Sequence, residues 1–161
     1  MKEKAICFTG HRDMQLSDRV EERLLALLEG YVQNGYDTFL AGGARGFDNL
    51  AAETVIRLRE KYPHIRLVIV LPFPSHYRHE QNWNSDEIKT YKGVLKKADE
   101  VITLCKEYKS GAYFKRNRYL VDNAGLCVAY YRRNGSGTAY TVNYARNCRM
   151  EIVNLAGSGV G

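Results

Sequence analysis

Residues 65–73 read IRLVIVLPF, and beyond Arg66 this run is apolar almost without interruption. Short, continuously apolar runs are typical of strands that are covered on both faces, as in parallel sheets flanked by helices. The run ends at Pro72, which lacks the N–H that a sheet ladder needs. We therefore expect a central strand here, with helices packed on both sides of the sheet.

The same pattern extends in both directions along the chain, where short apolar runs alternate with helical spacing of apolar residues. This alternation predicts an α/β fold, a Rossmann-like three-layer sandwich with a mostly parallel, doubly wound sheet of about six strands. Ser17 and Asp48 are the expected N-caps of the first two helices. The predicted strands are 4–10, 37–43, 65–73, 99–105, 126–131 and 149–155, and the helices 17–34, 48–62, one ending near 97, 112–123 and 138–147.

The length of 161 residues fits one Rossmann-like nucleotide-binding domain over 1–156 and a flexible tail over 157–161. A net charge of +6 favours anionic partners. Cys7 and Cys127 fall in predicted strands, and the four cysteines are widely spaced, so reduced thiols are expected. With no leader pattern and no apolar run long enough to span a bilayer, a cytoplasmic location is expected.

Ligands of doubly wound sheets bind beyond the carboxyl ends of the strands, near the point where strand order reverses. The loops that follow four of the predicted strands carry glycines, arginines and polar residues suited to an anion, because glycine amides and helix N-termini favour negative charge. We expect these loops to converge on one phosphate-bearing ligand. The candidate residues are Gly10, His11, Arg12, Gly42, Gly43, Arg45, Gly46, Asp48, Arg116, Asn117, Arg118, Gly135, Ser136, Gly137 and Thr138.

No single motif among these loops is specific. The segment GGARGFD at 42–48 does not have the GxGxxG spacing of the dinucleotide fingerprint, and it follows the second strand. The P-loop pattern GxxxxGK[ST] is absent from the sequence. His76 and His79 stand three apart without a third ligand of matching spacing, so no metal site is predicted.

Four motifs in order, FTGHR at 8–12, AGGARGFDNLAAE at 41–53, FKRNRYLVDNAG at 114–125 and GSGTAYTVNYA at 135–145, resemble the superfamily of DNA-processing protein A and LOG-type Rossmann proteins. The segments LPF, QNWN and KKADEVI are similar to its small YpsA-like branch, a domain of unknown function. The resemblance implies a homodimer, because relatives commonly pair through helices.

The resemblance also implies roles for particular residues. The RNR at 116–118 resembles a motif at the nucleic-acid phosphate pocket of the DNA-processing proteins, and GSGT at 135–138 resembles a turn that LOG proteins place against a nucleotide phosphate. LOG-type phosphoribohydrolases carry a glutamate just after that turn. Here the sequence continues AYTVNYA without a carboxylate, which argues against hydrolysis of the LOG kind.

The sequence therefore predicts a protein that binds a nucleotide or an ADP-ribose-like phosphate ligand, as a sensor or adaptor. Two alternatives stay open. An enzyme acting on an N-glycosidic bond of nucleotides would need a carboxylate near the ribose, with Asp48 or Glu53 as the candidates. A single-stranded nucleic-acid binder would use the basic edge together with tyrosines. Trp83 and Tyr77 either stack on a base or are buried between helices.

Overall fold

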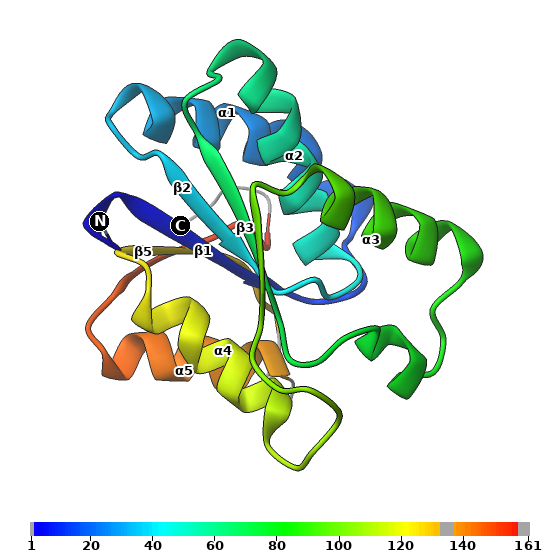
Figure 1. The fold of residues 1–161 in the computed structure, drawn as a ribbon. Coiled ribbons are helices and arrows are strands. Elements are labelled where there is room, and N and C mark those ends of the chain that lie inside the picture. Colours follow the sequence, from blue (N-terminus) through cyan, green and yellow to red (C-terminus); the bar gives the residue numbers. More distant parts are fainter. Residues whose placement is uncertain (1, 133–136, 158–161) are drawn as a thin grey trace.

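The computed structural model describes residues 2–132 and 137–157, and it forms one six-stranded sheet covered by helices on both faces (Figure 1). All five strand pairings are parallel, in the order β4-β3-β2-β1-β5-β6. This confirms the predicted doubly wound α/β fold. The strands are β1 (Ala5–Gly10), β2 (Thr38–Ala41), β3 (Arg66–Leu71), β4 (Glu100–Thr103), β5 (Leu126–Tyr130) and β6 (Glu151–Asn154).

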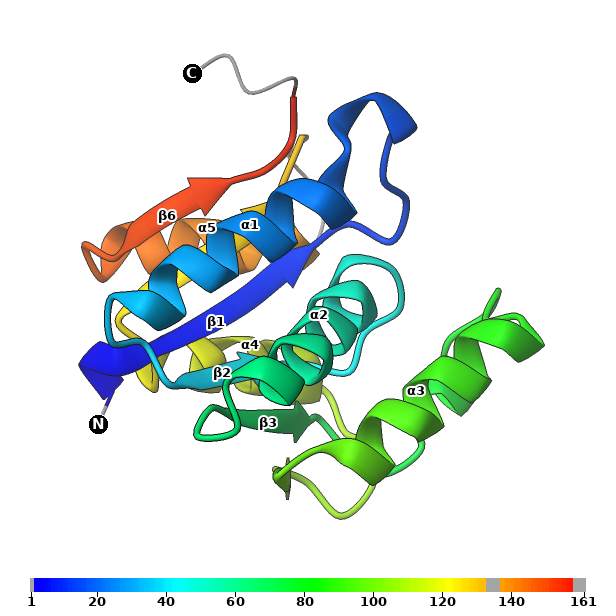
Figure 2. The same cartoon turned by 90° about the horizontal axis from the view of Figure 1, so that it is seen from above.

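Helices α1, α2 and α3 lie on one face of the sheet, and α4 and α5 lie on the other (Figures 1 and 2). The packing agrees with this division, because α1 contacts α2, α2 contacts α3, and α4 contacts α5. Three short 3-10 turns are described: η1 (Lys2–Lys4) precedes β1, η2 (Leu16–Asp18) precedes α1, and η3 (His76–His79) lies between β3 and α3. The helices are α1 (Val20–Gln33), α2 (Phe47–Lys61), α3 (Ser85–Lys97), α4 (Ala112–Asp122) and α5 (Gly137–Asn147).

Each central strand buries both of its faces, which explains its continuous apolar sequence. On β1, Ile6 and Phe8 join the core under α1, α2 and α3, whereas Cys7 joins the core on the side of α4 and α5. Cys7 lies opposite Cys127 of β5 in the sheet register, and both thiols are free and fully buried. The structure thus confirms the expectation that these two cysteines are reduced, buried hydrophobes.

All strands run in the same direction, but the order in which successive strands are added to the sheet reverses at β1. It runs outward from β1 to β4, and α4 then carries it back to β5, which pairs with the other side of β1. The switch point of the fold is therefore between β1 and β5, where the loops from the two halves separate and leave a crevice.

Two predicted helix caps are wrong. Helix α1 begins at Val20 after Arg19, which has a left-handed φ of 49°, while Ser17 lies inside the preceding 3-10 turn. Helix α2 begins at Phe47 with Gly46 at its N-cap, so Asp48 is inside the first turn and its side chain is free for another partner. Sequence spacing could not reveal that an additional short turn precedes α1.

Across the described ranges, no helix combines the length and apolarity that crossing a bilayer requires. Residues 158–161, which include most of the predicted flexible tail, lie outside the described residues.

Candidate functional site

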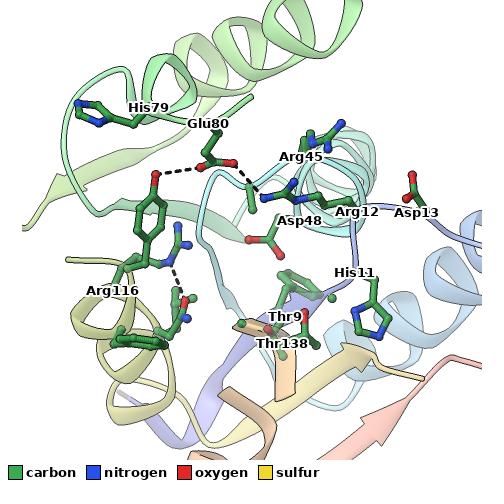
Figure 3. Close-up of a pocket in the computed structure, with 18 of the residues that line it drawn as sticks. Thr9, His11, Arg12, Asp13, Arg45, Asp48, His79, Glu80, Arg116 and Thr138 are labelled. Atoms are coloured by element: carbon green, nitrogen blue, oxygen red, sulfur yellow. Dashed lines mark hydrogen bonds and ion pairs between the residues drawn. The ribbon is translucent and has the colours of Figure 1, made fainter. Parts of the chain in front are cut away.

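A cavity of about 1000 Å³ lies beyond the carboxyl ends of the strands, at the switch point between β1 and β5. The loops after β1, β2, β3 and β4, one side of α4 and the first turn of α5 all contribute to its wall (Figure 3). Nine of the residues predicted from the sequence line it: Gly10, His11, Arg12, Arg45, Asp48, Arg116, Asn117, Gly137 and Thr138. The predicted convergence of separate loops on one edge of the sheet is therefore present.

Arg116 is the cation at the centre of this wall. It comes from the second turn of α4 and is buried, with only 6% of its surface exposed. Its Nε donates to Oδ1 of Asn117 at 2.8 Å, and one Nη donates to the carbonyl oxygen of Gly42. A guanidinium has five N–H donors, so its second Nη, for which the described residues supply no hydrogen bond, remains for a ligand.

Asp48 stands beside Arg116 and is held by the same peptide segment. Gly42 donates its N–H to Oδ2 of Asp48 at 3.1 Å, while its carbonyl accepts from Arg116. Gly42, in the β2–α2 turn, therefore holds a buried carboxylate and a buried guanidinium next to each other. In Figure 3 the Asp48 carboxylate is directed into the space between the labelled residues of the cavity.

Burial raises the pKa of Asp48 from 3.8 to about 6, although the positive charge of Arg116 and the amides of Gly42 and Ala44 act in the opposite direction. Removing a carboxylate from water disfavours its charged form, and here that effect is the largest. The same burial lowers the pKa of Arg116, with Asp48 as its main stabilising charge. A ligand with hydroxyl groups would compensate Asp48 by donating hydrogen bonds to it.

The glycines of the β2–α2 turn serve mainly to bring this pair close to the sheet. A Cβ at Gly42 would lie 2.9 Å from Nη1 of Arg116, and a Cβ at Gly46 would collide with the backbone of Arg12. Gly43 has a φ of 72° and its carbonyl is 3.1 Å from Nε2 of His76. Gly42, Gly43 and Gly46 are therefore behind the cavity wall and do not line it.

The loop after β3 closes the other side of the cavity through Glu80. Its Oε1 accepts from Nε1 of Trp83 at 3.1 Å and lies 3.6 Å from Nη2 of Arg12, and its Oε2 accepts from the Tyr113 hydroxyl at 3.1 Å. Arg45 joins the same side, since its Nη1 donates to the carbonyl of Asn82 at 2.7 Å. Arg12 keeps 52% of its side chain exposed and is the more available of these two arginines.

His11 and Thr138 form the floor of the cavity next to β5. Both are buried, and Nε2 of His11 accepts the backbone N–H of Arg132 at 2.9 Å, which fixes that nitrogen as unprotonated. Gly137 and Thr138 open α5, so the positive end of this helix is directed to the cavity. Gly135 and Ser136 of the same predicted turn lie outside the described residues.

Two residues predicted for the site lie elsewhere. Arg118 is two residues after Arg116 on α4, but its side chain is directed to α5. There its Nη1 donates to the Tyr140 hydroxyl at 2.8 Å. Glu53, the weak catalytic candidate, is on the exposed side of α2 in a small depression against α1, with Glu21 and Arg57. The carboxylates that line the large cavity are Asp13, Asp48 and Glu80.

The lining residues that the sequence analysis did not name include His79, Glu80, Tyr108 and Tyr113. The prediction used the loops after the first, second, fourth and fifth strands and omitted the irregular loop after the third. The rule that ligands bind at the carboxyl ends of strands applies equally to that loop, and would have included His79 and Glu80.

Comparison with known proteins places the chain in a family and agrees with its fold. The model of the YspA SLOG family matches residues 6–153. The chain is 32% identical over 142 residues to an uncharacterized SPbeta prophage-derived protein, YoqJ, of Bacillus subtilis, covering 80% of this chain and 81% of the relative. It is 33% identical over 134 residues to a UPF0398 protein of Halalkalibacterium halodurans, covering 81% of this chain and 67% of the relative.

Among solved structures, DNA processing protein A of Helicobacter pylori, a single-stranded DNA binder, superposes with a TM-score of 0.66 at 15% identity. The match covers 93% of this chain and 64% of that protein, so the chain spans a little under two thirds of its length. At this identity the likeness shows a shared fold.

Proposed function

Because the chain belongs to the YspA SLOG family, we propose that its cavity binds a nucleotide or a nucleotide-derived phosphate ligand and that the protein acts as a sensor or adaptor. The observation that carries this proposal is the buried Arg116 with an uncommitted Nη at the wall of a cavity of about 1000 Å³. Asp48 already lies beside this guanidinium, but none of the described residues forms a hydrogen bond with its second Nη, and phosphate matches the planar donor geometry of a guanidinium.

The charges of the cavity divide the expected ligand into two chemical parts. Arg12, Arg116 and the first turn of α5 favour the phosphate group. Asp48 lies beside Arg116 and Glu80 beside Arg12, and as acceptors both carboxylates suit the hydroxyl groups of a ribose next to the phosphate. A phosphorylated ribose satisfies both sets, whereas inorganic phosphate would use only the first.

A thermal-shift screen of nucleotides tests the proposal. A ligand at a hundredfold its Kd should stabilise the folded protein by about 2.7 kcal/mol, and the same ligand should stabilise it much less after Arg12→Ala. Arg146→Ala is the matched control, since it removes an equal charge from an exposed position in the last turn of α5. Absence of stabilisation by any nucleotide, or equal losses in both variants, would count against this function.

Binding of single-stranded nucleic acid is a second candidate. Tyr108 and Phe114 are exposed by 51% and 45% at the cavity rim, and Lys109 and Lys115 beside them are also exposed. The structural neighbour from Helicobacter pylori binds single-stranded DNA. Stacking aromatics and phosphate-binding cations are the usual components of such a surface.

Oligonucleotides distinguish the two candidates. The second candidate requires binding that tightens with strand length and weakens steeply with added salt, because each neutralised phosphate releases counterions. A mononucleotide that binds at least as tightly as an oligonucleotide, with a shallow dependence on salt, supports the cavity ligand instead.

A further inference from the structure

One wall of the cavity is aromatic and is assembled around Phe73. This residue follows β3 after Pro72 and is 1% exposed. Its ring centroid lies 5.0 Å from that of His79 and 5.6 Å from those of Tyr108 and Tyr113, all three in edge-to-face arrangements. Side chains from the loops after β3 and β4 and from α4 are thereby held in fixed orientations.

Tyr108 is the member of this cluster with an accessible surface. His79 stacks on it at 4.7 Å with an interplanar angle of 16°, while 51% of the residue stays exposed. Both line the cavity. A ring that is already held by His79 and Phe73 loses little conformational freedom when a second flat group stacks on it.

The other candidate for such a role does not reach the cavity. Trp83 packs against His76, Tyr77 and Tyr91, with ring centroids 5.6 to 5.9 Å apart, and it is not among the lining residues. Of the two roles open to Trp83 and Tyr77 from the sequence, the structure supports packing under α3.

The aromatic wall and the charged residues Arg12, Asp48 and Arg116 belong to the same cavity. Its volume of about 1000 Å³ exceeds what a phosphorylated sugar alone would fill. We infer that Tyr108, supported by His79 and Phe73, is a stacking subsite for a nucleobase and selects base-bearing ligands over sugar phosphates. The inference rests on the proposed function, which assigns the phosphate to the charged side.

Calorimetric titration of three probes separates the two sides of the cavity. AMP carries both a base and a phosphate, ribose 5-phosphate lacks the base, and adenosine lacks the phosphate. We expect Tyr108→Ala to weaken the binding of AMP and adenosine by about tenfold or more and to leave the affinity for ribose 5-phosphate unchanged. Tyr108→Phe is the matched control, because it keeps the ring and should bind all three probes like the unsubstituted protein. Tyr108 is half exposed, so neither substitution should impair folding.

The outcomes distinguish a failure of this inference from a failure of the proposed function. Equal affinity of the unsubstituted protein for AMP and ribose 5-phosphate, or equal weakening of all three probes by Tyr108→Ala, overturns the base subsite and leaves phosphate binding intact. Adenosine binding that depends on Tyr108, without any contribution from the phosphate of AMP, supports the subsite and overturns the phosphate assignment. Binding of none of the three overturns both.

Discussion

Substitution of Asp48 by asparagine tests whether the cavity holds a buried charge at the expense of stability. Burial raises the pKa of Asp48 to about 6, above the value of 3.8 of an ordinary aspartate. The folded protein therefore holds this proton more tightly than the unfolded chain does. In such a case stability falls as the pH rises from the unfolded to the folded pKa, because the unfolded chain releases the proton first.

The size of the effect follows from the difference between these two pKa values. Each pKa unit corresponds to about 1.4 kcal/mol, so ionised Asp48 costs the folded state about 3 kcal/mol at neutral pH. Asparagine resembles the protonated acid and its Oδ1 can still accept the N–H of Gly42. Asp48→Asn should therefore match the unsubstituted protein at about pH 3 and exceed its free energy of unfolding by about 3 kcal/mol at about pH 7.

The assay compares urea unfolding of the two proteins across this range. The free energy of unfolding of one protein is subtracted from that of the other, because both contain His76. Burial lowers the pKa of His76 from 6.5 to about 4, so this residue makes stability rise with pH, opposite to the effect of Asp48. Asp13→Asn serves as the control, since it removes an exposed carboxylate from the same cavity and leaves the buried Asp48 in place. A constant difference at all pH values, or a less stable Asp48→Asn protein at neutral pH, would refute the reasoning.

Three further predictions concern residues around the cavity. In urea unfolding, Gly46→Ala should lower the free energy of unfolding by more than about 2 kcal/mol, because φ at Gly46 is 82° and the new Cβ would meet the Arg12 backbone. Gly111→Ala is the control, since φ at Gly111 is 83° but the Cβ would lie in open space, and it should cost only about 1 kcal/mol. Equal losses in the two variants would contradict this prediction. Arg118→Ala should cost about 1 kcal/mol of stability through its lost hydrogen bond to α5 but leave AMP affinity unchanged in calorimetry, so a tenfold weaker affinity would place Arg118 in the site. Burial lowers the pKa of His76 from 6.5 to about 4, so this residue should lower the free energy of unfolding as the pH falls from about 6.5 to about 4. His76→Gln should remove that loss in urea unfolding. An unchanged dependence of the unfolding free energy on pH over this range would assign the loss to other groups.

The fold could be read from the sequence because its strands are short and buried on both faces. The run at Arg66–Leu71 matches a central strand, and the continuous apolar pattern of parallel strands left little ambiguity with amphipathic helices. Strand ends were less accurate. The expected fourth strand, 99–105, is reduced to Glu100–Thr103 at the edge of the sheet, where pairing on one side limits its extent.

The site could be predicted only at the level of loops. Topology places the loops at one edge, but the orientation of side chains on α4 depends on how the helix is rotated against the sheet. Arg116 and Arg118 are two residues apart, so on a helix they point in different directions, and only Arg116 faces the cavity. The sequence analysis named both arginines, and nothing in their spacing could have separated them.

The glycines illustrate a second limit of sequence reasoning. Gly42 and Gly46 suggested amides that cradle phosphate, yet in the structure their lack of a Cβ admits the Arg116 side chain and the Arg12 backbone. Both uses of glycine depend on close approach to its backbone, and a sequence does not say which group approaches. Tertiary contacts of the β2–α2 turn with α4 and with the loop after β1 decide it here.

A crystal structure of the protein with AMP tests the central assignment most directly. We predict that the phosphate lies within hydrogen-bonding distance of the Arg116 guanidinium and the first turn of α5, between β1 and β5. AMP bound at another surface, or seated in the cavity with its phosphate away from Arg116, would contradict the assignment.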